Sequence, residues 1–258
     1  MQNVYQETYF LSAGETDAEG RIALPLLVNK IIDIATAHAN SLGIGNPAMK
    51  DKNCGWVLSR LSIEAINLPR INSRYTLSTW VEGWNRHFSV RSFKLSDENG
   101  EPLAYARTIW MVLDMKSRTN YGLSHLRIPE DLVREEKVPM ELQAKHVRIL
   151  PYGESTPDGL AASCPAERWK FYYCDLDFYR HVNTVSYVRM ILNQFSLEEM
   201  DHRRVCRFEL SFMHEAKAGV WMQLRHAVTS DGAHAFSLSD EADPEKPLIF
   251  GRLFLTPR

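Results

Sequence analysis

The chain has few cysteines and no long hydrophobic run, and each shortage excludes a class of protein. The four cysteines are scattered, without a C-x-x-C pair and without the spacing of metal ligands. We therefore expect buried or free thiols in a reducing compartment and no structural zinc site. No cofactor is expected either. No apolar run approaches the roughly 20 residues that span a bilayer. The first residues also lack the basic and then apolar order of a signal peptide. A cytoplasmic protein without a membrane span is the expectation.

The sequence also lacks an excess of either charge. A formal net charge of −2 over 258 residues gives no overall field that would attract nucleic acid or an anionic membrane. An acidic partner would have to be met by a local basic patch, although solvated arginines on strand edges are the commoner interpretation of such residues. The two candidate patches are Arg86 with His87 and Arg91, and Arg203 with Arg204 and Arg207.

A regular order of elements is predicted for the first half. Apolar residues recur at three- and four-residue steps from Leu24 to Leu42, which predicts a helix that ends at Gly43. Because this helix is apolar on several faces, we expect protein to surround it. Short turn-forming clusters between the later segments favour an antiparallel meander. The predicted elements around the helix are a strand at 5–13, a loop at 46–53, and strands at 56–68, 75–84, 89–97 and 103–114.

The second half repeats this order after a proline-rich interruption. We expect an N-terminal domain at 1–126, a linker at 127–166 and a C-terminal domain at 167–258. Residues 93–97 and 105–108 are echoed by 236–240 and 250–253, each about 145 residues further on, which favours an internal duplication. The predicted elements are a strand at 168–173, a helix at 183–199, and strands at 203–213, 220–229, 234–239 and 248–255.

Residues 173–183 hold the most chemically informative stretch of the chain. Two acids and a histidine lie just before the predicted second helix, where the helix dipole stabilises negative charge on a substrate oxygen. On this stretch alone, the commoner interpretation is a helix cap, because Asp175, Asp177 and Asn183 are residue types that accept backbone hydrogen bonds. The spacing of these residues, together with the duplicated order of elements, favours a catalytic role for this stretch.

A helix wrapped by an antiparallel sheet, present twice, describes an α+β tandem (double) hotdog fold. The run D-L-D-F-Y-R-H-V-N-T-V-S-Y at 175–187 resembles the D-L-D-x-N-x-H-V-N-N-V-x-Y signature of the acyl-acyl carrier protein thioesterases, a plant-type family with bacterial members. The likeness covers essentially the whole chain in element order. The likeness is carried by a specific motif in the second half. In the first half it depends on the order of the elements and on residues 80–84.

The resemblance implies a catalytic role for Asp177, His181 and Glu215, with Asn183 at the helix entrance. Asp175 is expected to be structural. Tyr179 stands where the family usually has a catalytic asparagine, and a phenol could replace that amide only in part. Two further departures are Thr184 for the second asparagine and Ala216 for the plant cysteine, so no cysteine nucleophile is expected.

The implied reaction is hydrolysis of a fatty acyl thioester of acyl carrier protein. We expect the first half to be non-catalytic, since no histidine precedes its helix, and to enclose the acyl chain. The candidate acyl-chain contacts are Ile31, Ile34, Ala35, His38, Trp56 and Leu58, and the candidate carrier contacts are Arg203, Arg204 and Arg86.

Two alternatives stay open, hydrolysis of acyl-coenzyme A and acyl binding without catalysis. A dehydratase is disfavoured by the spacing of the motif. A monomer or a homodimer is expected, because tandem hotdogs can pair within one chain.

Overall fold

The structure is a computed structural model, and it describes residues 3–50, 52–124, 126, 132–144, 146–154, 156 and 159–258. The chain divides into two compact units, Met1–Glu141 and Leu142–Arg258, which we call unit 1 and unit 2. Residues 127–131 of the predicted linker lie outside the described residues, and its boundaries stay a prediction. Among the described residues, no helix combines the length and the apolarity needed to cross a membrane.

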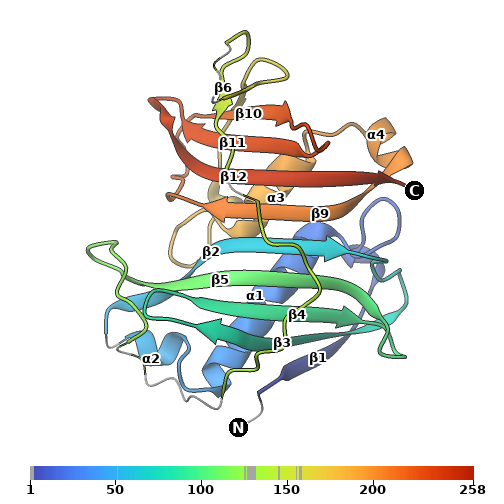
Figure 1. Cartoon of the computed structure of the whole chain (residues 1–258), viewed down its shortest axis with the longest axis vertical. Coiled ribbons are helices and arrows are strands. Elements are labelled where there is room, and N and C mark those ends of the chain that lie inside the picture. The colour runs from blue at the N-terminus through green and yellow to red at the C-terminus, as the bar shows by residue number, and fades with distance from the viewer. Residues whose placement is uncertain are drawn as a thin grey trace. The chain divides into compact units, whose positions relative to one another are not determined.

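Unit 1 is a five-stranded antiparallel sheet with one long helix packed against it (Figure 1). The strands pair in the order β1-β3-β4-β5-β2. The elements are β1 (Tyr5–Phe10), η1 (Ala13–Glu15), α1 (Leu24–Ser41), α2 (Asn46–Lys50), β2 (Cys54–Ala65), β3 (Arg74–Trp84), β4 (Ser89–Ser96) and β5 (Pro102–Asp114).

The predicted meander is correct for β3, β4 and β5 and wrong for β2. Strand β2 pairs with β5, with Cys54 opposite Asp114 and Ala65 opposite Ala104. The other side of β3 is filled by β1, whose Tyr5 lies opposite Thr79. Because β1 pairs with this side of β3, β2 cannot pair there. The short connection at 66–73 therefore crosses from β2 to β3 without forming a hairpin.

Unit 2 repeats this topology. Its sheet has the order β9-β12-β11-β10-β8, which matches unit 1 when β8 corresponds to β1 and β12 to β5. The register agrees as well, since Phe93 lies opposite Ala106 and Phe236 opposite Gly251. The sequence echo therefore falls on equivalent sheet positions. The elements are β6 (Ile149–Leu150), β7 (Leu160–Ala161), β8 (Glu167–Trp169), η3 (Tyr173–Asp175), α3 (Thr184–Leu192), α4 (Leu197–His202), β9 (Arg203–Phe212), β10 (Met222–Val228), β11 (His234–Asp240) and β12 (Asp243–Pro257).

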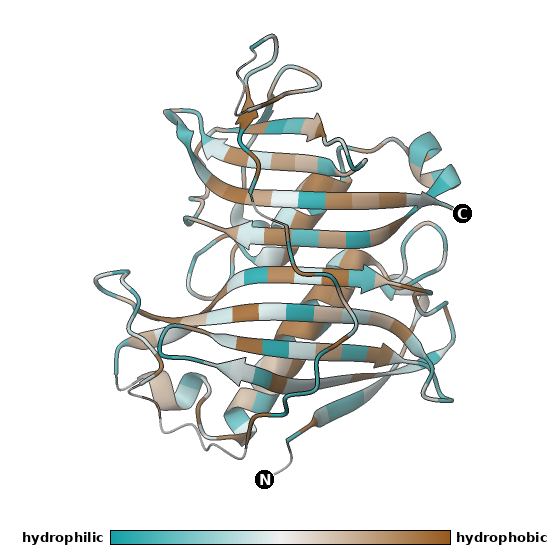
Figure 2. Ribbon diagram, viewed as in Figure 1, coloured by the Kyte–Doolittle hydropathy of each residue, from teal (hydrophilic) through white to brown (hydrophobic). Residues whose placement is uncertain are grey.

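Helix α1 forms the core of unit 1, as its periodicity predicts. Hydrophobic residues colour most of its visible surface behind the sheet (Figure 2). Pro25 lies in its first turn, where the missing N–H group has no helical partner to lose. The buried residues of α1 are Leu24, Leu27, Val28, Ile31, Ile34, Ala35 and His38.

The second helix is shorter than predicted, because the segment 183–199 contains two helix starts. Asn183 caps α3, and its side chain accepts the N–H of Ser186 at 2.9 Å. Ser196 then opens α4 with a capping box, in which its hydroxyl oxygen accepts the N–H of Glu199 and the glutamate accepts the N–H of Ser196. The new cap ends the continuous helix.

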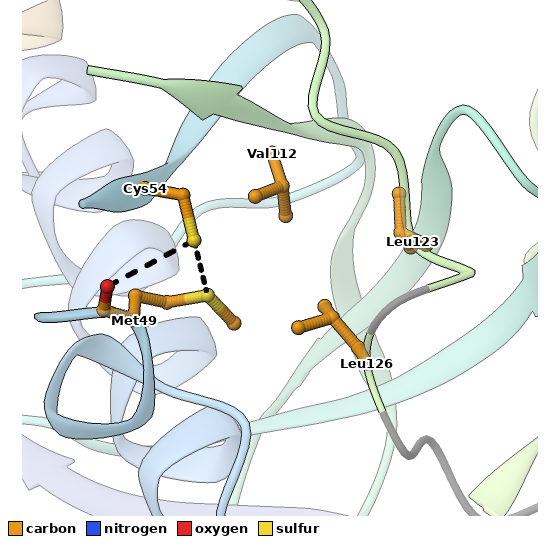
Figure 3. Packing of buried hydrophobic residues seen from close by; sticks show 5 residues of the cluster. All are labelled: Met49, Cys54, Val112, Leu123 and Leu126. Carbon is orange, nitrogen blue, oxygen red and sulfur yellow. Dashed lines mark hydrogen bonds between the residues drawn. The ribbon is translucent and has the colours of Figure 1, made fainter. Parts of the chain in front are cut away.

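A second difference is α2, which lies in a segment predicted as loop. It supplies Met49 to a buried cluster with Cys54, Val112, Leu123 and Leu126 (Figure 3). The Cys54 thiol lies 3.4 Å from the Met49 sulfur and 3.8 Å from its carbonyl oxygen. All four cysteines are free, as expected. A helix of five residues is too short to show a helical periodicity, so the pattern could not predict α2.

Gly251 provides a test of the contact between α3 and the unit 2 sheet. A Cβ atom at this position would lie 2.6 Å from Ile191 Cδ1, and both residues are buried. We expect Gly251→Ala to lower the free energy of unfolding by roughly 1–3 kcal/mol, as overpacked cores do. Ile191→Val removes the clashing atom, so the double variant should be more stable than the sum of the single effects predicts. Gly14→Ala is the control, since nothing lies within 4 Å of its added Cβ. Additive losses in chemical denaturation would contradict this packing.

Candidate functional site

The loop before α3 is closed by hydrogen bonds to two aspartates. Asp175 accepts the N–H of Tyr172 at 2.8 Å and the hydroxyl of Ser186 at 2.9 Å, so it ties η3 to the first turn of α3. This contact confirms its expected structural role. A bridge between Leu176 and Val182 then narrows the chain to a five-residue turn at 177–181.

Asp177 fixes this turn from inside. One oxygen, Oδ1, accepts the N–H groups of Tyr179 and His181 at 2.9 and 3.0 Å. The Asp177 N–H donates to the carbonyl of His181 at 2.8 Å. Arg180 adopts a left-handed backbone with φ 65°, which the tight turn requires. Among the described residues, the second carboxylate oxygen of Asp177 receives no hydrogen bond.

The structure brings His181 and Glu215 together. The His181 Nε2 atom lies 3.5 Å from Glu215 Oε2, and the two side chains are 27% and 44% exposed. Glu215 follows β9, where the N–H groups of Met213 and His214 both donate to the carbonyl of Leu248. This double contact turns the chain after β9 and places the glutamate beside the histidine.

Tyr187 joins these residues, although the sequence did not predict a functional role for it. Its side chain on α3 is 2% exposed and packs edge-on against Phe171 and Phe212. Burial raises the pKa of the Tyr187 phenol well above its ordinary value. A hydrogen bond from the Ala216 backbone lowers this pKa, and the charges of Glu215 and Asp177 raise it. Tyr187 is the last residue of the 175–187 motif, and that position was the available signal.

Exposed aromatic rings surround the turn. Tyr173 and Phe178 are 88% and 78% exposed, and Tyr179 is 42% exposed. The Tyr179 ring lies 3.9 Å from that of Phe178 and 6.3 Å from that of His181, measured between centroids. The ring of Tyr179 therefore stands beside the histidine at the open side of the turn.

Unit 1 contains the same turn with different chemistry. Asp17 Oδ1 accepts the N–H groups of Glu19 and Arg21 at 3.0 and 2.9 Å, and Gly20 has φ 67°. Arg21 occupies the position of His181, and its guanidinium donates to Asn67 Oδ1 at 2.8 Å. The turn geometry is thus shared by both units, whereas the histidine and its glutamate occur only in unit 2.

Unit 1 instead holds a largely apolar pocket of about 550 Å³, which is partly open to solvent. Of the six predicted acyl-chain contacts, Ala35 and Trp56 line it. Ile31, Ile34 and His38 are at most 1% exposed and belong to the core around α1. Leu58 is half-buried on β2 and is not among the lining residues.

Two arginines assigned to basic patches are buried, so that part of the prediction is wrong. Arg91 is 5% exposed on β4, and Arg207 is 8% exposed on β9. Arg207 Nη2 lies 2.6 Å from Glu209 Oε1. Arg91 lies on the face of its sheet that packs against α1, where it contacts His38. Arg207 lies on the face of its sheet opposite to α3, where its Nη2 donates to the carbonyl of Leu142 at 3.2 Å.

The remaining basic candidates are at least partly exposed. Arg86 is exposed in the turn between β3 and β4. Arg203 is exposed at the start of β9, and Arg204 follows it, half-buried. Glu215 follows the other end of the same strand, so roughly 30 Å of extended chain separates it from Arg203.

Comparisons with known proteins agree with this architecture. The model of the acyl-ACP thioesterase N-terminal domain matches residues 2–135, and that of the C-terminal domain matches residues 163–245, where ACP is acyl carrier protein. A chloroplastic acyl-[acyl-carrier-protein] hydrolase of Cuphea viscosissima is 24% identical over 229 residues, which cover 83% of this chain and 52% of that protein. A chloroplastic palmitoyl-acyl carrier protein thioesterase of Cuphea hookeriana is 26% identical over 225 residues, covering 82% and 52%. The chain thus spans about half the length of these relatives.

Two solved structures share the fold along the whole chain. The acyl-ACP thioesterase of Bacteroides thetaiotaomicron VPI-5482 superposes with a TM-score of 0.86 at 24% identity and covers 98% of both chains. The 12:0-ACP thioesterase of Umbellularia californica has a TM-score of 0.80 at 15% identity, with 100% of this chain and 99% of that chain covered. The predicted α+β double hotdog is confirmed. Matched along both of its halves by the two domain models, the chain belongs to the acyl-ACP thioesterase family.

Proposed function

We propose that the chain hydrolyses fatty acyl-ACP to a free fatty acid and the carrier protein, and that unit 2 carries the catalytic centre. The observation that supports this most is the 3.5 Å approach of His181 to Glu215 beside the Asp177 turn. Family membership supplies the substrate class. Catalysis of this kind needs an acid-base group, a means of orienting it and a place for negative charge.

The start of α3 provides the place for negative charge. Backbone N–H groups in the first turn of a helix attract a developing oxyanion, and the helix dipole adds to this effect. Asn183 shapes this turn through its bond to Ser186. In our proposal the thioester carbonyl oxygen approaches this end of the helix.

Asp177 is the proposed base or nucleophile. Its Oδ1 is used to hold the turn, and its Oδ2 is the oxygen that could activate water or attack the carbonyl. His181 would share or relay the proton, and Glu215 would orient the imidazole. Tyr179 would contribute its single hydroxyl where the family usually has an amide.

Unit 1 is the proposed acyl-chain domain. Its pocket has mostly apolar walls that include Ala35 and Trp56, as sites for apolar small molecules do. The turn that holds Asp17 lacks a histidine, which supports a non-catalytic role. A cytoplasmic location and a monomeric or homodimeric state stay predictions from the sequence.

The duplicated turn offers a matched test of catalysis. Asparagine keeps an oxygen that can accept both N–H groups, so Asp177→Asn and Asp17→Asn should preserve their turns equally. We expect Asp177→Asn to lower kcat on acyl-ACP by about 10²- to 10⁴-fold, the usual contribution of an acid-base group. Asp17→Asn should stay within twofold of the wild type. The measurement is released fatty acid, with thermal unfolding of both variants as the folding control. Equal losses in the two variants, or none in Asp177→Asn, would remove the carboxylate from the mechanism.

Carrier choice can be tested by charge reversal. ACP is acidic, so changing Arg203 and Arg204 to Glu should lower kcat/KM for acyl-ACP by on the order of tenfold at low salt and leave acyl-coenzyme A much less affected. Arg148→Glu with Lys246→Glu is a control of equal charge change elsewhere on unit 2. A wild type that turns over acyl-coenzyme A faster than acyl-ACP would favour coenzyme A as the carrier. Saturable acyl binding without turnover would indicate a binding protein.

A further inference from the structure

Arg91 is a buried cation in the wall of the unit 1 pocket. It lies on β4, is 5% exposed and contributes to the pocket lining. Burial lowers its pKa to about 10, so the guanidinium still carries its charge at neutral pH. A buried charge is unfavourable unless another group compensates it.

The contacts of Arg91 do not supply a compensating charge. Its Nη1 lies 2.8 Å from His38 Nδ1 and 3.4 Å from Thr79 Oγ1. Because arginine can only donate, Nδ1 must accept, which requires a neutral imidazole. Within the described part of the chain, no carboxylate forms an ion pair with Arg91, and its other N–H groups have no hydrogen-bond partner.

Arginines on the opposite faces of the two sheets, away from the helices, are paired. Arg107 on β5 forms two bonds with Glu82, at 2.9 and 3.1 Å. Arg207 is paired with Glu209 at 2.6 Å. Arg91 differs from these arginines because it has no carboxylate partner among the described residues. It also lines the unit 1 pocket, which they do not.

Most of the rest of the wall is apolar, and its other polar side chains, those of Thr36, Asn46 and Ser89, carry no charge. The indole N–H of Trp56 donates to the carbonyl of Ile44 and that of Trp110 to Thr108, both at 2.7 Å. With their donors occupied, the two indoles offer apolar surface, as do Ala35, Ala39 and Val81. Arg91 is the cation in this lining.

We propose that the unit 1 pocket binds a free fatty acid, with its carboxylate on the Arg91 guanidinium and its chain along the tryptophan and alanine walls. A carboxylate matches the paired N–H groups of a guanidinium and neutralises its single charge. The choice of a fatty acid rests on the proposed function, since it is the product of that reaction. Because the acid would occupy the proposed acyl-chain pocket, it would inhibit hydrolysis competitively.

The test compares three ligands that share one alkyl chain. Tryptophan fluorescence of the full chain is titrated with a medium-chain fatty acid, its methyl ester and the corresponding alcohol, with Trp56 and Trp110 as reporters. We expect the acid to bind at least tenfold more tightly than the ester or the alcohol. Arg91→Met should abolish that preference, and Arg91→Lys should keep part of it. Thermal unfolding confirms that each variant is folded, and the comparison on the wild type needs no variant.

Asp177→Asn separates this proposal from the proposed function. It should keep the full preference for the acid, because the readout is binding. Equal affinity of the wild type for acid and ester would overturn the proposal, as would undiminished preference in folded Arg91→Met. If the wild type shows no thioester turnover but prefers the acid, the proposed hydrolysis fails and the carboxylate site stands.

Discussion

The hydrogen bonds from two backbone N–H groups to one aspartate oxygen are the constraint on which the site depends. In unit 2 they fold residues 177–181 into a turn that delivers His181 to the entrance of α3. In unit 1 the same bonds to Asp17 deliver Arg21 to the entrance of α1. Since both units keep the turn, its geometry serves the fold, and the chemistry depends on the residues that it presents.

The two units present different residues and accordingly differ in what they can do. Unit 2 places a histidine beside a glutamate at the start of a short helix. Unit 1 has Arg21 at the position of the histidine, and this arginine is hydrogen-bonded to Asn67. The helix that follows has 18 residues and lies beside a largely apolar pocket. In the proposed function, the duplicated fold separates acid-base chemistry from recognition of a long apolar ligand without changing its sheet order.

The sequence predicts those features that depend on local periodicity or on a complete motif. The span of α1 and its buried face follow from apolar spacing, and the turn and the cap at Asn183 follow from side chains that accept nearby N–H groups. The position of β2 could not be predicted, because strand pairing is decided by β1, which lies far away in sequence. The end of α3 was missed because the cap at Ser196 lies inside an otherwise helical pattern.

The prediction that Arg91 and Arg207 belong to basic surface patches was also wrong, because both are buried. Arg91 is covered by α1, where it contacts His38, and Arg207 is covered by the segment that begins at Leu142, to whose carbonyl it donates at 3.2 Å. Both contacts join residues more than 50 positions apart, so no local pattern shows them. The proximity of His181 and Glu215, 34 positions apart, came from the family resemblance, since no local pattern connects β9 with the turn. The catalytic roles themselves stay a proposal.

A double-mutant cycle on His181 and Glu215 tests the central claim most directly. The values of kcat/KM for acyl-ACP are measured for the wild type, His181→Gln, Glu215→Gln and the double variant. If the two side chains act as one unit, each single change lowers kcat/KM strongly and the double variant is no more than about threefold below the poorer single variant. Losses that multiply, or a single variant with the wild-type rate, would contradict the account.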